Sequence, residues 1–195
     1  MRILSPHLNI LLGLSLLKEL ENKIFPFKFR CVRCGKCCTQ MLTGVPLYYT
    51  DIKNISCSIG LKMNAFVKQY CELTLHQIRT GKKILNIPVL YLKTTKEKCI
   101  FYKSNGCTVH NVKPYCCSAA PFISLLFQDY DMIDFFKKQC NGFGHGTYYN
   151  KRKIKQILKK EVELEETEWQ LFNNGLYSNL VKLLNGKGGK NDPST

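Results

Sequence analysis

The chain has 195 residues, of which 45% are hydrophobic and 11% aromatic, and its formal net charge at pH 7 is +15. This composition excludes an intrinsically disordered chain and is sufficient for one folded domain with a buried core. So positive a charge is typical of proteins that bind nucleic acid or anionic membranes.

Residues 1–24 are predicted to form an amphipathic helix. The segment begins with one basic residue and an apolar run, as a signal peptide does, but no small-x-small cleavage site follows before Lys18 and Glu19. The run is also shorter than the roughly 20 apolar residues that a membrane-spanning helix needs. We therefore expect no membrane span and a reducing, cytoplasmic location, in which thiols stay free to bind metal.

The next segments are predicted to be two helices and a strand. Apolar residues at helical spacing place the helices over residues 52–59 and 65–79, and Gly60 ends the first of them. Residues 84–93 are rich in strand-forming side chains. Pro88 interrupts this run, so we expect the strand to lie at a sheet edge or to contain a break.

The second half of the chain is expected to be mostly helical. A turn is predicted at residues 104–106, whereas the apolar segment 123–138 fits either a strand or a helix. The predicted organisation is an N-terminal amphipathic helix (1–24), a cysteine-cluster metal-binding domain (25–149), C-terminal helices (150–184) and a disordered tail (185–195). The expected fold class is α+β: a small, mainly helical single domain with short strands and long loops, organised by metal.

Eleven cysteines are the most informative feature of the sequence. Their odd number, their CxxC spacing and an adjacent Cys-Cys pair favour metal ligation over a disulfide framework. The run Cys31-Val-Arg-Cys34-Gly-Lys-Cys37-Cys38 contains two overlapping CxxC steps, much as in a bacterial ferredoxin. Adjacent side chains usually point apart, so we expect Cys37 and Cys38 to serve two neighbouring metal centres.

The remaining ligands are expected further along the chain. The full predicted set is Cys31, Cys34, Cys37, Cys38, Cys99, Cys107, Cys117 and Cys140. This number fits two four-thiolate sites that hold either zinc or [4Fe-4S] clusters, with a total charge of roughly −4 that part of the lysine excess would balance. Gly142, Gly144 and Gly146 are predicted to bind a cofactor, because the backbone amides of their loop can face sulfur or an anionic ligand.

Four further side chains were weighed as ligands or as ordinary residues. Cys57 and Cys71 lie on predicted helices and are expected to be buried, small apolar residues. Cys116 either is a spare thiol or replaces Cys117 as a ligand. His145 lies in the glycine loop, where it either orients a substrate or faces water.

These motifs resemble the CxxCxxCC family, the YkgJ-like zinc- or iron-chelating domain that also includes the flagellin lysine N-methylases. The resemblance spans about residues 27–146 and covers the first cysteine run, the segment 99–122 and the Cys140-Asn-Gly-Phe-Gly-His-Gly loop. Lys113 stands where the family has arginine, and Ser118 replaces the arginine that follows the matched cysteine. The resemblance implies metal binding, and iron–sulfur binding in the methylase branch.

Three classes of function follow. The first is a metal-binding protein that acts as an accessory, electron-transfer or metal-handling factor for an unknown protein partner, and this is the class we expect. The second, implied by the resemblance, is a [4Fe-4S]-dependent transfer of a methyl group from S-adenosylmethionine to a protein lysine, with catalytic residues unknown. The third is a zinc-stabilised nucleic-acid-binding protein, which the charge favours although no recognisable module is present.

Overall fold

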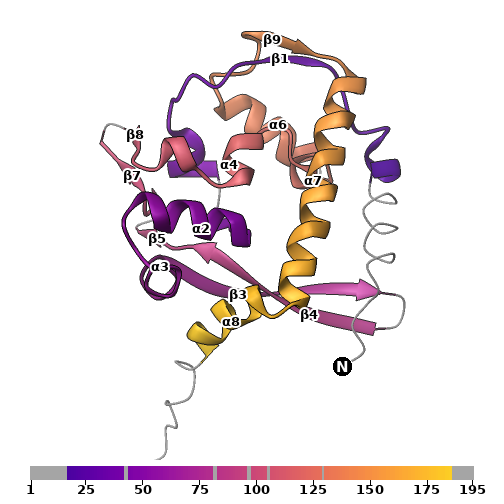
Figure 1. Cartoon of the computed structure of the whole chain (residues 1–195). Helices are drawn as coiled ribbons and strands as arrows, with labels where there is room; N and C mark the ends of the chain where they lie inside the picture. Colours follow the sequence, from indigo (N-terminus) through magenta and orange to yellow (C-terminus); the bar gives the residue numbers. More distant parts are fainter. Residues whose placement is uncertain are drawn as a thin grey trace, which may run out of the picture.

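The fold comes from a computed structural model, which describes residues 17–41, 44–80, 83–95, 98–104, 106–128 and 130–185 (Figure 1). The helical segments are η1 (Cys37–Met41, a π-helical turn), α2 (Tyr49–Ser58), α3 (Met63–Tyr70), η2 (His110–Val112, a 3-10 turn), α4 (Tyr115–Ala119), α5 (Ser124–Gln128), α6 (Tyr130–Gln139), α7 (Lys151–Asn173) and α8 (Leu176–Asn185). The strands are β1 (Phe27–Phe29), β2 (Val45–Pro46), β3 (Cys71–Thr80), β4 (Lys83–Leu92), β5 (Thr94–Thr95), β6 (Lys98–Cys99), β7 (Tyr102–Lys103), β8 (Gly106–Cys107) and β9 (Thr147–Tyr149). Helices and short antiparallel strands in small sheets confirm the α+β prediction.

The longest strands form the β3–β4 hairpin, in which Cys71 pairs with Leu92 and Thr80 pairs with Lys83. The prediction of one helix over residues 65–79 is therefore wrong beyond Tyr70. Residues 71–80 alternate polar with apolar side chains and include β-branched threonine and isoleucine, which favours a strand over a helix. Ten paired residues on β4 supply the partner that this segment needs.

The three-stranded sheet has the order β2-β4-β3, yet β2 pairs only with Tyr91 and Leu92 of β4. Pro88 pairs with Leu75 on β3, and within the described residues no strand lies on its other side. Proline lacks an N–H donor, so this position suits it. The predicted strand and its edge-like proline are confirmed.

Several predicted helices are also confirmed. The first begins at Tyr49, slightly earlier than expected, and Gly60 follows it with a φ of 72°. The segment that fitted either class is helical, as α5 and α6, and the C-terminal segment forms α7 and α8. At the N-terminus residues 17–20 are helical, but residues 21–23 form a turn, so the predicted first helix (1–24) is wrong beyond Leu20. Residues 1–16 of that helix and nearly all of the predicted disordered tail (186–195) lie outside the described residues, so the domain boundaries stay predictions.

Apolar side chains gather in three clusters. The largest joins α2, α3, β4 and α8 and includes Ile52, Phe66 and Leu90, each with 0% exposure. A second, aromatic cluster joins β1, β9 and the first turns of α7, and a small third one joins α5 and α6. Figure 1 shows α7 running from the β1–β9 pair at the top to α8 and the β3–β4 hairpin at the bottom, so this helix connects the clusters.

Buried carboxylates fix the starts of three helices. Glu168 accepts hydrogen bonds from the Tyr49 N–H and, at 2.8 Å, from the Thr50 hydroxyl at the start of α2. Asp51 accepts from the first N–H of α4 at 3.0 Å, and Glu161 accepts from the first N–H of α5 at 2.7 Å. The first N–H groups of a helix lack partners within it and carry partial positive charge, so these contacts hold the short helices in place.

Candidate metal centres

The first cysteine run begins in a segment without regular structure and ends in η1. Gly35, with a φ of 73°, lies beneath the ring of Tyr102, and a Cβ added there would lie 2.4 Å from the Tyr102 hydroxyl oxygen. Only glycine therefore fits at position 35, directly after Cys34. The N–H of Cys38 donates to the Gly35 carbonyl at 2.9 Å, which turns the chain so that Cys37 and Cys38 face inward while Cys31 and Cys34 stay exposed.

Cys37 and Cys38 lie closer together than their positions in the sequence predicted. Their sulfur atoms are 3.9 Å apart and share a hydrogen bond. The bond from Cys38 lowers the pKa of Cys37 to about 7, whereas donating that bond, together with burial, raises the pKa of Cys38. The expectation that these two side chains point apart is wrong, because the π-helical turn brings both sulfurs to one side.

Three of the other predicted ligands share a local geometry. Burial raises the pKa of Cys99, Cys107 and Cys140, and the backbone N–H two residues further along, of Phe101, Val109 and Gly142 respectively, opposes that rise. The short β5–β6 and β7–β8 hairpins and the loop after α6 create these turns. An N–H that points at sulfur favours the thiolate over the thiol, and metals bind the thiolate.

α4 carries the adjacent pair Cys116 and Cys117. The sulfur of Cys116 lies 3.7 Å from the carbonyl oxygen of Pro46, on the strand β2. A hydrogen bond with Cys116, followed by burial, raises the pKa of Cys117, and the charge of Cys37 raises it further. Of the two thiols, Cys117 therefore faces the other cysteines, as the sequence predicts for the ligand of the pair.

Electrostatic interactions divide the eight predicted ligands. Cys140 interacts with the charges of Cys31, Cys34 and Cys37. These four cysteines form the first set, and Cys38, Cys99, Cys107 and Cys117 form the second. In the second set, the charges of Cys99 and Cys117 act on Cys38, those of Cys107 and Cys117 act on Cys99, and that of Cys117 acts on Cys107. Cys37 interacts with both sets, because it also affects Cys99, Cys107 and Cys117.

Packing divides the cysteines along the same line. Cys37 and Cys140 pack against the small cluster of Ile123, Leu126, Ile133 and Phe136. Cys99, Cys107 and Cys117 instead pack against the largest cluster, which α2, α3 and β4 build. Five of the eight predicted ligands are thus held by two different parts of the core, and Cys31, Cys34 and Cys38 are not among the side chains of these clusters.

In the part of the chain that the structure describes, no group of three or more Cys, His, Asp or Glu side chains meets the geometry of a bound metal ion. The thiols are neighbours without converging on one point. Their chemistry nevertheless fits the metals expected, since Zn²⁺ and iron–sulfur clusters both take four thiolates. Repulsion between neighbouring thiolates, which raises several of these pKa values, is relieved when a cation lies between them.

The glycine loop after Cys140 packs closely on the end of β1. A Cβ at Gly142 would lie 2.5 Å from the Arg30 carbonyl oxygen, and one at Gly146 would lie 2.4 Å from the Arg30 Cβ. The N–H of Gly144 donates to the Lys28 carbonyl at 2.9 Å. These contacts give Gly142 and Gly146 a packing role between the loop and β1, and cofactor binding by the three glycines stays a prediction.

The remaining candidates fall outside both sets. Cys71 is buried, with 1% exposure, as predicted, but Cys57 is exposed and the prediction of burial is wrong. Cys57 lies in the last turn of α2, on the side away from the buried residues Ile52 and Ile55. His145 is exposed in the glycine loop.

Two residues near the cysteines were not recognised as important from the sequence. Tyr102 covers Gly35, and Lys113 interacts with the charges of Cys37, Cys107 and Cys117. The position of Lys113 in the sequence, between Cys107 and Cys116, could have indicated its role.

Among the described residues, no helix has the length and apolar character that crossing a membrane requires.

Comparison with known proteins gives one match. Searches among curated proteins and among solved structures returned none. A family model, CxxCxxCC, described as “Putative zinc- or iron-chelating domain”, matches residues 30–141, which is more than half of the chain and contains all eight predicted ligands. This match supports a metal-binding cysteine cluster without deciding between zinc and iron. The chain belongs to the CxxCxxCC family of zinc- or iron-chelating domains.

Proposed function

We propose that the chain binds two adjacent metal centres and acts as an accessory, electron-transfer or metal-handling factor. The first centre is formed by Cys31, Cys34, Cys37 and Cys140, and the second by Cys38, Cys99, Cys107 and Cys117. The observation that carries this proposal is the double division of the thiols, by electrostatic neighbours and by the core cluster on which they pack. Each set of four matches the ligand number of Zn²⁺ or a [4Fe-4S] cluster.

Cys37 belongs to the first centre on the basis of its packing. Its side chain lies with Cys140 on the small cluster of α5 and α6, whereas Cys38 does not. The 3.9 Å between the two sulfurs supports two centres that are next to each other. Such proximity suits the transfer of electrons or of a metal ion between them.

Exposure indicates which centre meets other molecules. Cys31 and Cys34 are exposed, whereas all four thiols of the second centre are half-buried. A redox partner, a metal donor or a substrate would therefore reach the first centre.

Metal analysis of protein purified without oxygen tests the proposal. We expect either two zinc ions per chain and no visible colour, or about eight irons and eight sulfides with visible absorbance. Single Cys→Ser variants at Cys34 and Cys107 should each lose one centre and keep the other, while Cys57→Ser, an exposed cysteine outside both sets, keeps both. A chain that holds one metal centre in total, lost in both variants, would contradict the two-centre arrangement.

The second candidate is the [4Fe-4S]-dependent protein-lysine N-methyltransferase. A catalytic cluster needs one iron without a cysteine ligand, so this candidate requires that one of the four thiols of the first centre does not bind the cluster. The exposure of Cys31 and Cys34 would let a substrate reach such an iron. Labelled S-adenosylmethionine distinguishes the two candidates: binding to the iron-loaded chain supports the methyltransferase, and no binding to a fully loaded chain rejects it. Nothing in the described structure favours nucleic-acid binding, which stays a prediction from the charge.

A further inference from the structure

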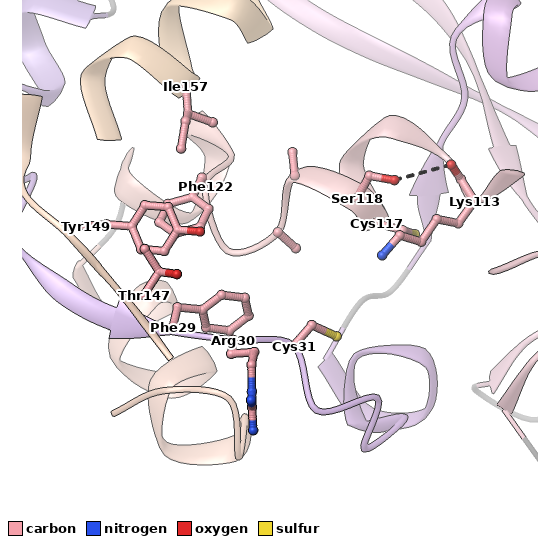
Figure 2. A pocket seen from close by; sticks show the side chains of 12 residues that line it. Phe29, Arg30, Cys31, Lys113, Cys117, Ser118, Phe122, Thr147, Tyr149 and Ile157 are labelled. Carbon is pink, nitrogen blue, oxygen red and sulfur yellow. Dashed lines mark hydrogen bonds between the residues drawn. The ribbon is translucent and has the colours of Figure 1, made fainter. Parts of the chain in front are cut away.

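A pocket of about 410 Å³ lies between the two proposed centres, against β1, β9, α4 and α7. Figure 2 shows an apolar end with Phe122, Tyr149 and Ile157, and a polar end with Lys113, Cys117 and Ser118. Phe29, Arg30 and Cys31 line the side between the two ends. The volume lies within the range of pockets that bind small molecules, about 300–1,000 Å³.

The apolar end is shaped for a flat group. The rings of Phe122 and Tyr149 have centroids 4.4 Å apart, and the edge of Phe29 meets Phe122 at 5.8 Å. Phe122 belongs to the aromatic core cluster, so this wall is held firmly. Aromatic walls of this kind bind planar apolar groups through area burial and ring contacts.

The polar end carries positive charge. Lys113 is half-buried, and its side chain extends past Cys117 toward the middle of the pocket (Figure 2). No Asp or Glu is among the described residues that line the pocket, and Arg30 adds a second positive charge at its side. The Ser118 hydroxyl, which donates to the Lys113 carbonyl at 3.5 Å, lies beside the lysine. This end matches a carboxylate, for which the lysine ammonium group is an ordinary partner.

The metal centres do not reverse this preference. Two four-thiolate centres carry roughly −4 in total. The formal net charge of +15 exceeds this, so the chain stays positive with both centres loaded. Lys113 and Arg30 are the basic side chains among the described residues that line the pocket.

We propose that this pocket binds a small aromatic or otherwise planar carboxylate, with its flat part against Phe122 and Tyr149 and its carboxylate at Lys113. Cys31 of the first centre and Cys117 of the second both line the pocket, so the ligand would lie beside both metals. The proposal deepens the proposed function, because it assigns a ligand class to the surface next to the centres. The pocket itself is formed by the chain alone.

Ligand-observed fluorine NMR on the metal-loaded full chain tests this inference with 4-fluorobenzoate, 4-fluorobenzamide and 4-fluorobenzylamine. We expect the carboxylate to bind at least about tenfold more tightly than the neutral amide or the cationic amine, since its charge pairs with Lys113. Lys113→Met should weaken carboxylate binding at least about tenfold, whereas Lys103→Met, a change at an exposed lysine outside the pocket, should change it less than about twofold.

A second variant probes the apolar end. Ile157→Trp fills the space beside Phe122 and should abolish binding of the carboxylate while Lys113 stays in place. Preference for the amide or the amine, no binding of any probe, or carboxylate binding unaffected by both variants would overturn the inference. Metal content, measured on every sample, separates the two proposals: loaded protein without binding rejects the pocket ligand alone, and binding to a chain that takes up no metal rejects the metal centres alone.

Discussion

The ligands of the two proposed centres lie on different elements of the fold and differ in their exposure. Three ligands of the second centre, Cys99, Cys107 and Cys117, lie on two short hairpins and α4 and pack against the largest core cluster, whereas the fourth, Cys38, lies on η1; all four thiols are half-buried. In the first centre, Cys31 and Cys34 are exposed in a segment without regular structure, and Cys37 on η1 and Cys140 before the glycine loop pack on the small clusters. The comparison shows how one chain can hold one metal as part of its core and present another to partners.

The largest expected effect concerns the ligands themselves. Cys107→Ser should remove the second metal and lower Tm by more than about 10 °C, since metal binding there is coupled to folding of the main core. Cys34→Ser should remove the first metal and lower Tm by less than about 5 °C. Circular dichroism melting with metal analysis measures both. Equal losses of Tm would show that the two centres contribute alike to folding and would break the comparison.

The rates at which the two centres lose their metal to a chelator can also be compared. With excess chelator, the exposed first centre should lose its metal at least about tenfold faster than the second, because release from the second needs a local opening of the core. Stopped-flow absorbance of the released metal–chelator complex should show two phases. Cys34→Ser should lack the fast phase and Cys107→Ser the slow one; a single phase in the wild type would mean that exposure does not control release.

Substitutions in the glycine loop test how the first centre is held in place. Gly142→Ala places a Cβ against the Arg30 carbonyl and the Phe29 ring, which should lower the free energy of unfolding by about 2–4 kcal/mol and weaken the first metal. Gly144→Ala meets no atom within 4 Å and costs only the strain of its positive φ, about 1 kcal/mol. Urea unfolding with metal analysis compares them. A larger loss in Gly144→Ala would contradict the packing role of Gly142.

The sequence predicted the chemistry of the site better than its geometry. Ligand types, glycine turns and most helices follow from local patterns that spacing reveals. The strand at residues 71–80 was missed because the helical spacing of the residues before it was extended too far, and because its pairing partner on β4 becomes visible only in the fold. The approach of Cys37 to Cys38 depends on a π-helical turn, and sequence patterns do not predict such turns.

Which side chains of α6 and α7 are buried also could not be predicted from the sequence. In α7, Glu161 and Glu168 are buried although they follow a basic stretch on the same helix. In α6, the aromatic side chain of Phe135 is 50% exposed. Spacing along one helix does not show which other helix starts lie against it, so the role of these carboxylates becomes visible only in the fold.

The buried carboxylates near each centre make the stability of the fold depend on pH. Burial raises the pKa of Glu161, which holds the start of α5 near the first centre, to about 7. It raises the pKa of Asp51, which holds the start of α4 in the second centre, to about 6. A carboxyl whose pKa is higher in the folded state than in the unfolded state favours folding at low pH, and that contribution is lost as pH rises through the folded pKa.

Glu161→Gln keeps an acceptor for the Ser124 N–H but cannot ionise, so its stability relative to wild type should increase from about pH 4.5 to about pH 7 and then level off, by at most about 3 kcal/mol. Asp51→Asn should show the same sign with its plateau reached near pH 6. Glu163→Gln, on the exposed face of the same helix, serves as the control and should give a flat difference. Urea unfolding of metal-loaded protein between pH 4.5 and 8 provides the measurement, because effects of pH on metal binding are common to all variants and cancel in the differences. A Glu161→Gln difference that stays flat, or that falls as pH rises, would mean that α5 is not held by an ionisable buried carboxylate, and the support of the first centre would then rest on the glycine loop and β1 alone.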